Sequence, residues 1–260
     1  MSRVLVTGSA DGLGRMAAQL LVQGGHRVVL HARDERRAAD AMAAVPGADA
    51  FVTGDLSTLE GMTGVARQAN ALGILDAVIH NAAVGTREAR RMTKDGFEHV
   101  FATNTLAPYL LTALIAPPKR LVYLSSGLHR SGSSNLQDLN WTSRPWNGLQ
   151  AYSDTKLHDV LLAFAVARLW PKTFSNALEP GWVATKMGGA GAPDDLAQGA
   201  VTQAWLAAGE AHAAEVTGQY FYHQAHAKTH PDAHNTEVQD ALLAACAKLT
   251  GTRLPLSAKK

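Results

Sequence analysis

Residues 4–14 read VLVTGSADGLG, a short run typical of a buried strand followed at once by a loop with three glycines. The Ala-rich segment Gly14–Gln23 comes next and has the composition of a helix. Glycines between a strand and a helix let the backbone turn tightly and approach a pyrophosphate, which backbone N–H groups and the positive end of the helix then hold. The order of strand, loop and helix therefore favours a dinucleotide-binding turn over a plain tight turn.

Beyond this unit, short runs of Val, Leu and Ile alternate with longer Ala-rich segments. The pattern is typical of repeated βαβ units and predicts an α/β fold, a doubly wound and mostly parallel seven-stranded sheet of the Rossmann type with helices on both faces. The expected strands are 4–7, 27–31, 50–53, 77–80, 120–124, 174–178 and 219–222. The expected helices are 14–23, 35–44, 59–71, 97–116, 151–169, 194–208 and 237–248. Two irregular regions, 127–150 and 188–193, are expected to be long loops.

Composition limits the classes of function. The 260 residues carry a formal net charge of +2, too small for a dedicated nucleic-acid or acidic-membrane surface. The single cysteine, Cys246, cannot form an intramolecular disulfide and is expected in the core. No apolar run approaches the length of a membrane span, and the first strand begins too early for a signal peptide. We therefore expect one cytoplasmic domain over residues 1–260, with residues 187–215 as a substrate loop or lid.

The end of the second predicted strand bears on the choice of cofactor. NAD-selective sites usually place an acidic residue there, but this chain has Ala32 followed by Arg33. A guanidinium pairs well with a 2′-phosphate, so NADP(H) is favoured and NAD is the alternative. Arg33 could instead be a solvated charge, and Asp11 and Asp34 would repel a phosphate. Asp55, after the third strand, could contact the adenine or cap the next helix.

Tyr152 and Lys156 lie four residues apart in a predicted helix and therefore share one face of it. A free tyrosine is a poor proton donor or acceptor at neutral pH, but a neighbouring ammonium stabilises its phenolate. Such a pair could also be an ordinary surface feature.

Together with the glycine loop, Ser125–Ser126 at the end of a strand, Asn81 and Asn104, this pair makes the chain resemble the short-chain dehydrogenase/reductase family. The resemblance extends from Val4 through residues 178–185 (LEPGWVAT) to residue 221. It implies transfer of a hydride between NADP(H) and a carbonyl or alcohol substrate.

The resemblance also implies roles for individual residues. Tyr152 would donate and accept the proton, Lys156 would bind the nicotinamide ribose and lower the pKa of Tyr152, and Ser126 would hydrogen-bond the substrate oxygen. Asn104 would hold a water in a proton relay through Lys156. The expected cofactor-binding residues are Gly8, Ser9, Gly12, Leu13, Gly14, Arg33, Asp55, Leu56, Asn81, Ala82, Ala83, Tyr152, Lys156, Pro180, Gly181, Val183 and Thr185.

Two departures from the family pattern have consequences. Ala83 replaces the usual glycine after the fourth strand, which would cost roughly 1 kcal/mol if that position needs a positive φ. Ser126 and Tyr152 are 26 residues apart, about twice the common separation, as in retinol dehydrogenases and related reductases. The side chains of this insertion, His129, Trp141, Trp146 and Leu149, could line an apolar substrate pocket, or the tryptophans could simply pin a surface loop.

Several alternatives remain at this point. His223, His226, His230 and His234 could bind a metal, but Pro231 interrupts their segment and we expect none. A non-catalytic NADP-binding redox sensor is the main rival function. A sugar-nucleotide epimerase is a weaker rival, because it usually has a sizeable extra domain and only residues 188–260 follow Met187. The substrate stays undetermined, and homo-oligomers could pair through helices 97–116 and 151–169.

Overall fold

The computed structural model describes residues 1–209 and 214–256, so the expected lid segment 187–215 lies partly outside the described residues. The described strands form one sheet in the order β3-β2-β1-β4-β5-β6-β7-β8. The strands are β1 Arg3–Val6, β2 Arg27–Ala32, β3 Ala50–Thr53, β4 Ala77–His80, β5 Arg120–Leu124, β6 Phe174–Glu179, β7 Tyr220–Tyr222 and β8 Ala225–His226. β1 to β7 are parallel and β8 pairs antiparallel with β7. The predicted α/β fold is confirmed, with one additional two-residue strand that is too short to leave a periodic pattern in the sequence.

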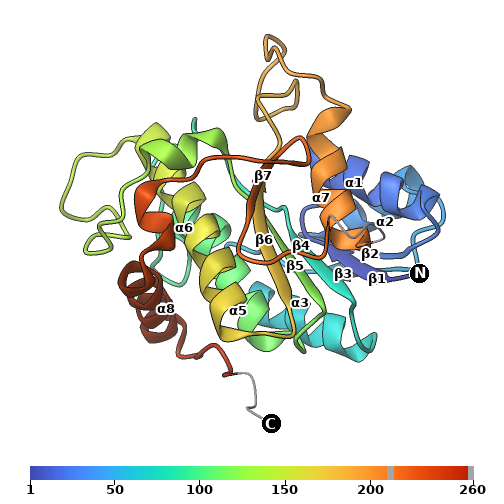
Figure 1. Ribbon diagram of the computed structural model, residues 1–260, viewed down its shortest axis with the longest axis horizontal. Helices are drawn as coiled ribbons and strands as arrows, with labels where there is room; N and C mark the ends of the chain where they lie inside the picture. The colour runs from blue at the N-terminus through green and yellow to red at the C-terminus, as the bar shows by residue number, and fades with distance from the viewer. Residues whose placement is uncertain (210–213, 257–260) are drawn as a thin grey trace.

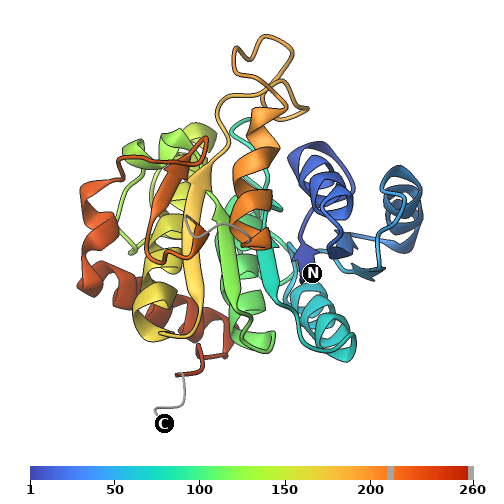
Figure 2. The same cartoon turned by 45° about the vertical axis from the view of Figure 1, so that its right-hand side comes forward.

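Helices cover both faces of this sheet, as Figures 1 and 2 show. On one face lie α1 Gly12–Gln23, α2 Glu35–Ala44 and α7 Gln198–Ala208; on the other lie α3 Leu59–Ala71, α5 Ala107–Leu114, α6 Gly148–Leu169 and α8 Thr236–Thr250. β1 divides the core between these layers, because Val4 and Val6 join the cluster under α1 and α7 while Leu5 joins the one under α3 and α6. This alternation is the period of two expected of a strand buried on both sides.

The predicted helix 97–116 is continuous only in part. It consists of α4 His99–Phe101, a π-helical turn at Ala102–Leu106, and α5. π-turns commonly lie at functional sites, and this one contains Asn104.

The insertion between β5 and α6 begins with a 3₁₀ turn at Gly127–Ser131 and then runs along the N-terminal half of α6. Trp141 and Trp146 pack edge to face, with ring centroids 5.3 Å apart, and Arg144 stacks over Trp141. The other end of α6 packs against α8. As a result α6 is buried within the chain from Ala151 to Val166. Pairing of subunits through the segments 97–116 and 151–169 stays a prediction.

The remaining expectations concern the C-terminal third. Cys246 is fully buried in the core, as predicted, and burial raises the pKa of its thiol. The histidines at 223, 226, 230 and 234 lie along the segment from β7 to a 3₁₀ turn at Pro231–His234. Within the described residues, no group of three or more His, Cys, Asp or Glu side chains is arranged to hold a metal ion. None of the helices described in these ranges has the length and apolar character needed to cross a membrane.

Candidate active site

The glycine loop between β1 and α1 forms one wall of a cavity of about 540 Å³. Gly8 has a φ of +66°, and a Cβ at Gly14 would lie 2.4 Å from Asn81 Nδ2 and 2.5 Å from the Gly8 carbonyl oxygen. The loop can therefore pack this closely only because glycine stands at both positions. Asp11 caps α1 by accepting the Gly12 N–H. The backbone at the start of this helix faces the cavity, as the dinucleotide prediction requires.

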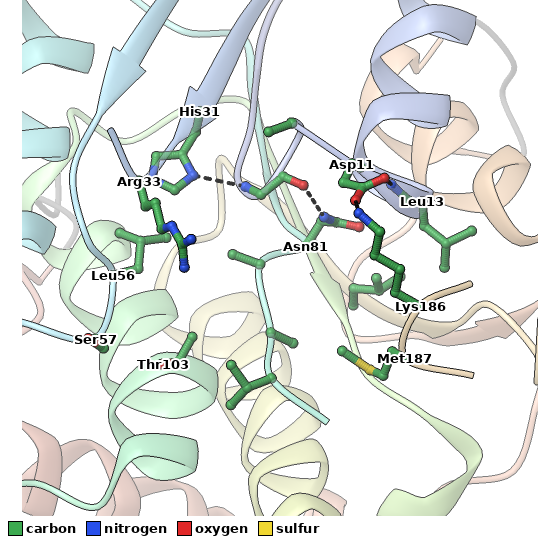
Figure 3. Close-up of a pocket in the computed structure, with 18 of the residues that line it drawn as sticks. Asp11, Leu13, His31, Arg33, Leu56, Ser57, Asn81, Thr103, Lys186 and Met187 are labelled. Atoms are coloured by element: carbon green, nitrogen blue, oxygen red, sulfur yellow. Dashed lines mark hydrogen bonds and ion pairs between the residues drawn. The ribbon is translucent and has the colours of Figure 1, made fainter. Parts of the chain in front are cut away.

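Asn81, directly after β4, fixes the loop from the other side of the cavity. Its Nδ2 donates to the carbonyl oxygens of Thr7 at 2.9 Å and Gly8 at 3.3 Å, the second of which is drawn in Figure 3. The Thr7 hydroxyl accepts the N–H groups of Asn81 and Ala82. Ser9 does not line the cavity: it is fully buried and its hydroxyl accepts the backbone N–H of His31 at 2.8 Å. Ser9 therefore supports the loop from behind.

His31, on β2, is a residue of the site that no sequence motif predicts. Its Nδ1 accepts the Gly8 N–H at 2.9 Å, as Figure 3 shows. The Nε2 atom must therefore carry the proton and donate to the Gly54 carbonyl at 3.0 Å. The neutral ring thus ties the glycine loop to the end of β3. Burial lowers the pKa of His31 to about 4, which keeps this tautomer in place at neutral pH. Its only signal in the sequence is a polar residue near the end of an apolar strand.

We expect stability to fall in acid, because burial lowers the pKa of His31 to about 4 and that of His80 to about 3. An unfolded histidine has a pKa of about 6.5, so between that pH and the folded-state pKa values the unfolded chain binds a proton that the folded chain excludes. The stabilisation is therefore complete above about pH 6.5 and is lost as the pH falls toward the folded-state values. Each such group contributes a slope of up to about 1.4 kcal/mol per pH unit. Urea unfolding between pH 7.5 and 4.5 measures this slope. The variant His80→Phe should lower the slope by the contribution of one histidine. A stability independent of pH in this range would contradict the expectation.

At the end of β2 the cavity carries positive charge. Arg33 and Arg37 line it beside Asp55, Leu56 and Ser57. Arg33 is exposed and lies 3.6 Å from Asp34, which also caps α2. Asp55 does not cap the next helix, because Thr58 does so; Asp55 instead accepts the Ser57 N–H at 2.9 Å. Although burial acts in the opposite direction, hydrogen bonds from Ser57 hold the pKa of Asp55 below its usual value.

Lys186 reaches the glycine loop from the segment that follows β6. Figure 3 shows its ammonium paired with Asp11 across the mouth of the cavity. The hydrogen bond from Lys186 lowers the pKa of Asp11. Asp11 and Asp34, the two carboxylates expected to repel a phosphate, therefore both have cationic partners. The contact of Lys186 could not be predicted from sequence patterns, because 175 residues separate it from Asp11.

Tyr152 and Lys156 occupy successive turns of α6 and are both buried. The Lys156 Nζ lies 5.6 Å from the centre of the Tyr152 ring and donates to the Leu124 carbonyl at 2.7 Å. Ser125 ties the strand to the helix by donating to the Lys156 carbonyl at 2.7 Å. Ser126, the next residue, caps the 3₁₀ turn through a 3.3 Å hydrogen bond from the Leu128 N–H. The end of β5 and α6 thus bring together three of the four expected catalytic side chains.

Asn104, the fourth expected catalytic residue, contacts the helix of this group through Thr155. Its amide nitrogen donates to the Val84 carbonyl at 3.0 Å and to Thr155 Oγ1 at 3.1 Å, and its oxygen accepts the Val84 N–H at 2.8 Å. It therefore ties the chain after β4 to the helix of Tyr152. The structure places no hydrogen bond between Asn104 and Lys156 within the described residues.

Ala83 lines the cavity beside Ala82. The non-glycine residues with positive φ in the described chain are Trp141, His223 and Gln224, so Ala83 adopts an ordinary conformation. The cost of roughly 1 kcal/mol, expected if alanine had to adopt a positive φ, therefore does not apply.

Tyr152 also lines a second cavity, of about 910 Å³, which shares part of its wall with the cavity of the glycine loop. Ser126 lines this second cavity, as do Gly181 and Val183, whereas Pro180 and Thr185 line both. Its larger apolar side chains are Leu13, Leu128, Leu149, Trp182 and Met187.

Of the four insertion side chains considered as a substrate wall, Leu149 alone lines this second cavity. His129 is fully buried against Tyr220, with ring centroids 4.5 Å apart. Trp146 donates its indole N–H to the Glu88 carbonyl at 3.1 Å, and Trp141 is buried against it. The two tryptophans therefore pin the insertion, and the tryptophan that lines the second cavity is the exposed Trp182.

The sequence matches a family model described as short chain dehydrogenase over residues 2–195. The chain belongs to the short-chain dehydrogenase family. It is 42% identical over 260 residues to an uncharacterized oxidoreductase of Emericella nidulans, covering 98% of this chain and 99% of that one. It is 30% identical over 287 residues to human retinol dehydrogenase 13, covering 97% and 85%.

Among solved structures, an uncharacterized protein from Mycobacterium paratuberculosis is similar with a TM-score of 0.85 and 28% identity, covering 98% of this chain and 96% of that chain. This short-chain dehydrogenase is therefore an oxidoreductase with retinol dehydrogenases among its relatives, as the motifs predict.

Proposed function

We propose that this short-chain dehydrogenase interconverts a ketone or aldehyde with the corresponding alcohol and uses NADP(H). The observation that carries the proposal is the position of Tyr152, whose side chain lines both cavities. Lys156 adjoins it in the cavity of the glycine loop, and Ser126 adjoins it in the other. A phenol at this junction can exchange a proton with a substrate on one side while a cofactor lies on the other.

The first cavity fits a dinucleotide. Its glycine loop leaves open space where a Cβ at Gly12 would lie, and the N-terminus of α1 favours an anion there. Gly8, Gly14 and Asn81 would hold the pyrophosphate end, and Lys156 the nicotinamide ribose. When bound, a nicotinamide cofactor would supply the hydride that carbonyl reduction needs.

The residues of the chain supply the proton and its control. In the reductive direction Tyr152 donates its phenolic proton to the substrate oxygen, which the Ser126 hydroxyl orients by a hydrogen bond. The buried Lys156 ammonium stabilises the phenolate that remains. Asn104 supports this arrangement through Val84 and Thr155.

Arg33 and Arg37 support the preference for NADP(H). Both guanidinium groups line the cavity at the end of β2, where the neutral Ala32 is buried. Charge-assisted hydrogen bonds to a phosphate are worth about 1.5–3 kcal/mol, whereas NADH offers these arginines no phosphate at that position.

The substrate side is the second cavity, and its leucines, Met187 and Trp182 favour an apolar carbonyl or alcohol. We propose that residues 187–197, which come between Trp182 and α7, form the movable wall of this cavity. Figure 2 shows that the segment after β6 projects beyond the sheet. The rest of the expected lid, α7, packs its buried alanines into the core, and residues 210–213 lie outside the described ranges. A cytoplasmic location stays a prediction.

The proposal is tested by screening aldehydes and ketones with NADPH and NADH. We expect NADPH-dependent reduction, and tighter binding of NADPH than of NADH by at least tenfold. Arg33→Ala should remove most of that difference, whereas Arg36→Ala, an exposed neighbour outside the cavity, should not. Binding of NADPH without turnover of any carbonyl would instead favour the redox-sensor alternative, and equal affinity for both cofactors would overturn the role of Arg33.

A further inference from the structure

The carboxylate of Asp159 lies one helical turn beyond Lys156 and contacts it directly. Its Oδ2 is 2.8 Å from the Lys156 Nζ, and the two side chains are 2% and 3% exposed. The motif of Tyr152 and Lys156 does not include this residue. A buried carboxylate costs several kcal/mol to desolvate, so its pairing with the ammonium behind Tyr152 needs an explanation.

Lys156 is held from two sides. It donates to Asp159 and to the Leu124 carbonyl, the two hydrogen bonds being 2.8 and 2.7 Å long. An ammonium has three N–H donors, so one remains for the cofactor side of the cavity that Lys156 lines. The pair with Asp159 therefore sets the direction in which this last donor points.

Lys156 supplies the positive charge that balances the Asp159 carboxylate. The titratable groups placed against Asp159 in the described chain are Lys156 on its own helix and Tyr123 on β5, with His80 on β4 packed behind Tyr123. Burial raises the pKa of Tyr123 and lowers that of His80 to about 3, so both are neutral at pH 7. Burial also raises the pKa of Asp159, to about 6, while Lys156 acts in the opposite direction. Above that pH the pair consists of one positive and one negative charge.

We propose that Asp159 is a positioning residue that fixes the Lys156 ammonium beside Tyr152 and cancels most of its charge. The inference deepens the proposed function, in which Tyr152 exchanges the proton. An unpaired ammonium 5.6 Å from the ring would stabilise the phenolate strongly, whereas a paired one does so less. Asp159 thus limits how far the ammonium stabilises the phenolate, which favours the use of Tyr152 as a proton donor in reduction.

The test is a pH titration of tyrosinate absorbance in the full chain, with the Tyr152→Phe signal subtracted to isolate Tyr152. The other tyrosines interfere little, because burial raises the pKa of Tyr109 to about 12 and raises those of Tyr123, Tyr220 and Tyr222. Asp159→Asn keeps a hydrogen-bond acceptor and removes the charge. We expect it to lower the pKa of Tyr152 by about one pH unit, a tenfold rise in tyrosinate below the transition.

Two further variants keep the inference falsifiable if Asp159→Asn does not fold. Lys156→Met should move the Tyr152 titration in the opposite direction. The double variant Lys156→Met/Asp159→Asn removes both buried charges and should return the titration to within about 0.3 pH unit of the unmodified chain, because the net charge is again zero. A purely structural role for Asp159 predicts lower stability with no fall in the Tyr152 pKa, and that result would overturn the proposal. The titration needs no substrate, so failure to reduce any carbonyl would count against the proposed function alone.

Discussion

Replacing Tyr152 with phenylalanine should reduce kcat for carbonyl reduction by about 10²–10⁴-fold while changing the affinity for NADPH less than threefold. The substitution removes only the hydroxyl, and the ring still fills the buried position between the two cavities. Tyr220 is a poor substitute, because burial raises its pKa and its ring packs against His129. Tyr222 also lines the second cavity, and its pKa is raised as well. Single-turnover kinetics with saturating NADPH would measure the loss, and fluorescence titration the affinity.

A matched control is Tyr109→Phe. The Tyr109 hydroxyl donates to the Thr252 carbonyl at 2.8 Å and lies outside both cavities. Its removal should cost about 1 kcal/mol of stability and leave kcat unchanged. If Tyr152→Phe kept most of the activity, the proton would have to come from another group, and Ser126 would be the first to examine.

Much of this architecture can be predicted from local sequence because its causes are local. The strand 4–7 and the glycines after it are adjacent in the chain, and the alternation of Val4, Leu5 and Val6 between two core layers is a direct result of strand geometry. Tyr152 and Lys156 meet because four residues make one helical turn. The role expected of Ser126 comes instead from the resemblance to the family, because 26 residues separate it from Tyr152.

The parts that could not be predicted depend on contacts between distant segments. His31 supports the glycine loop 23 residues away, and Lys186 pairs with Asp11 across 175 residues. Asp159 is adjacent to the motif, yet its significance depends on burial, which periodicity in an all-buried helix does not reveal. The tryptophans of the insertion illustrate the same limit. Their size predicts burial, but only the fold decides that they pack on each other while Trp182 lines the second cavity.

The glycine loop allows a second large effect to be predicted, for Gly14→Ala. The added methyl would lie 2.5 Å from the Gly8 carbonyl oxygen and 2.4 Å from Asn81 Nδ2. Gly8 cannot move away freely, because its N–H is bound to His31, and Asn81 is held by Thr7. We expect a loss of about 1–3 kcal/mol of unfolding free energy from overpacking. Displacement of the loop by about 1 Å should also lower kcat/KM by about 100-fold.

Gly64→Ala provides the control for this substitution. Gly64 lies within α3, and a Cβ there would meet only Gln68 Nε2, at 4.0 Å. Alanine should stabilise that helix by up to about 1 kcal/mol and leave NADPH binding unchanged. Urea unfolding and NADPH titration of both variants separate the two effects. If Gly14→Ala bound NADPH as tightly as the unmodified chain, the contact between Gly8, Gly14 and Asn81 would not be what shapes the pyrophosphate site. The backbone N–H groups at the start of α1 would then have to bind the pyrophosphate without that support.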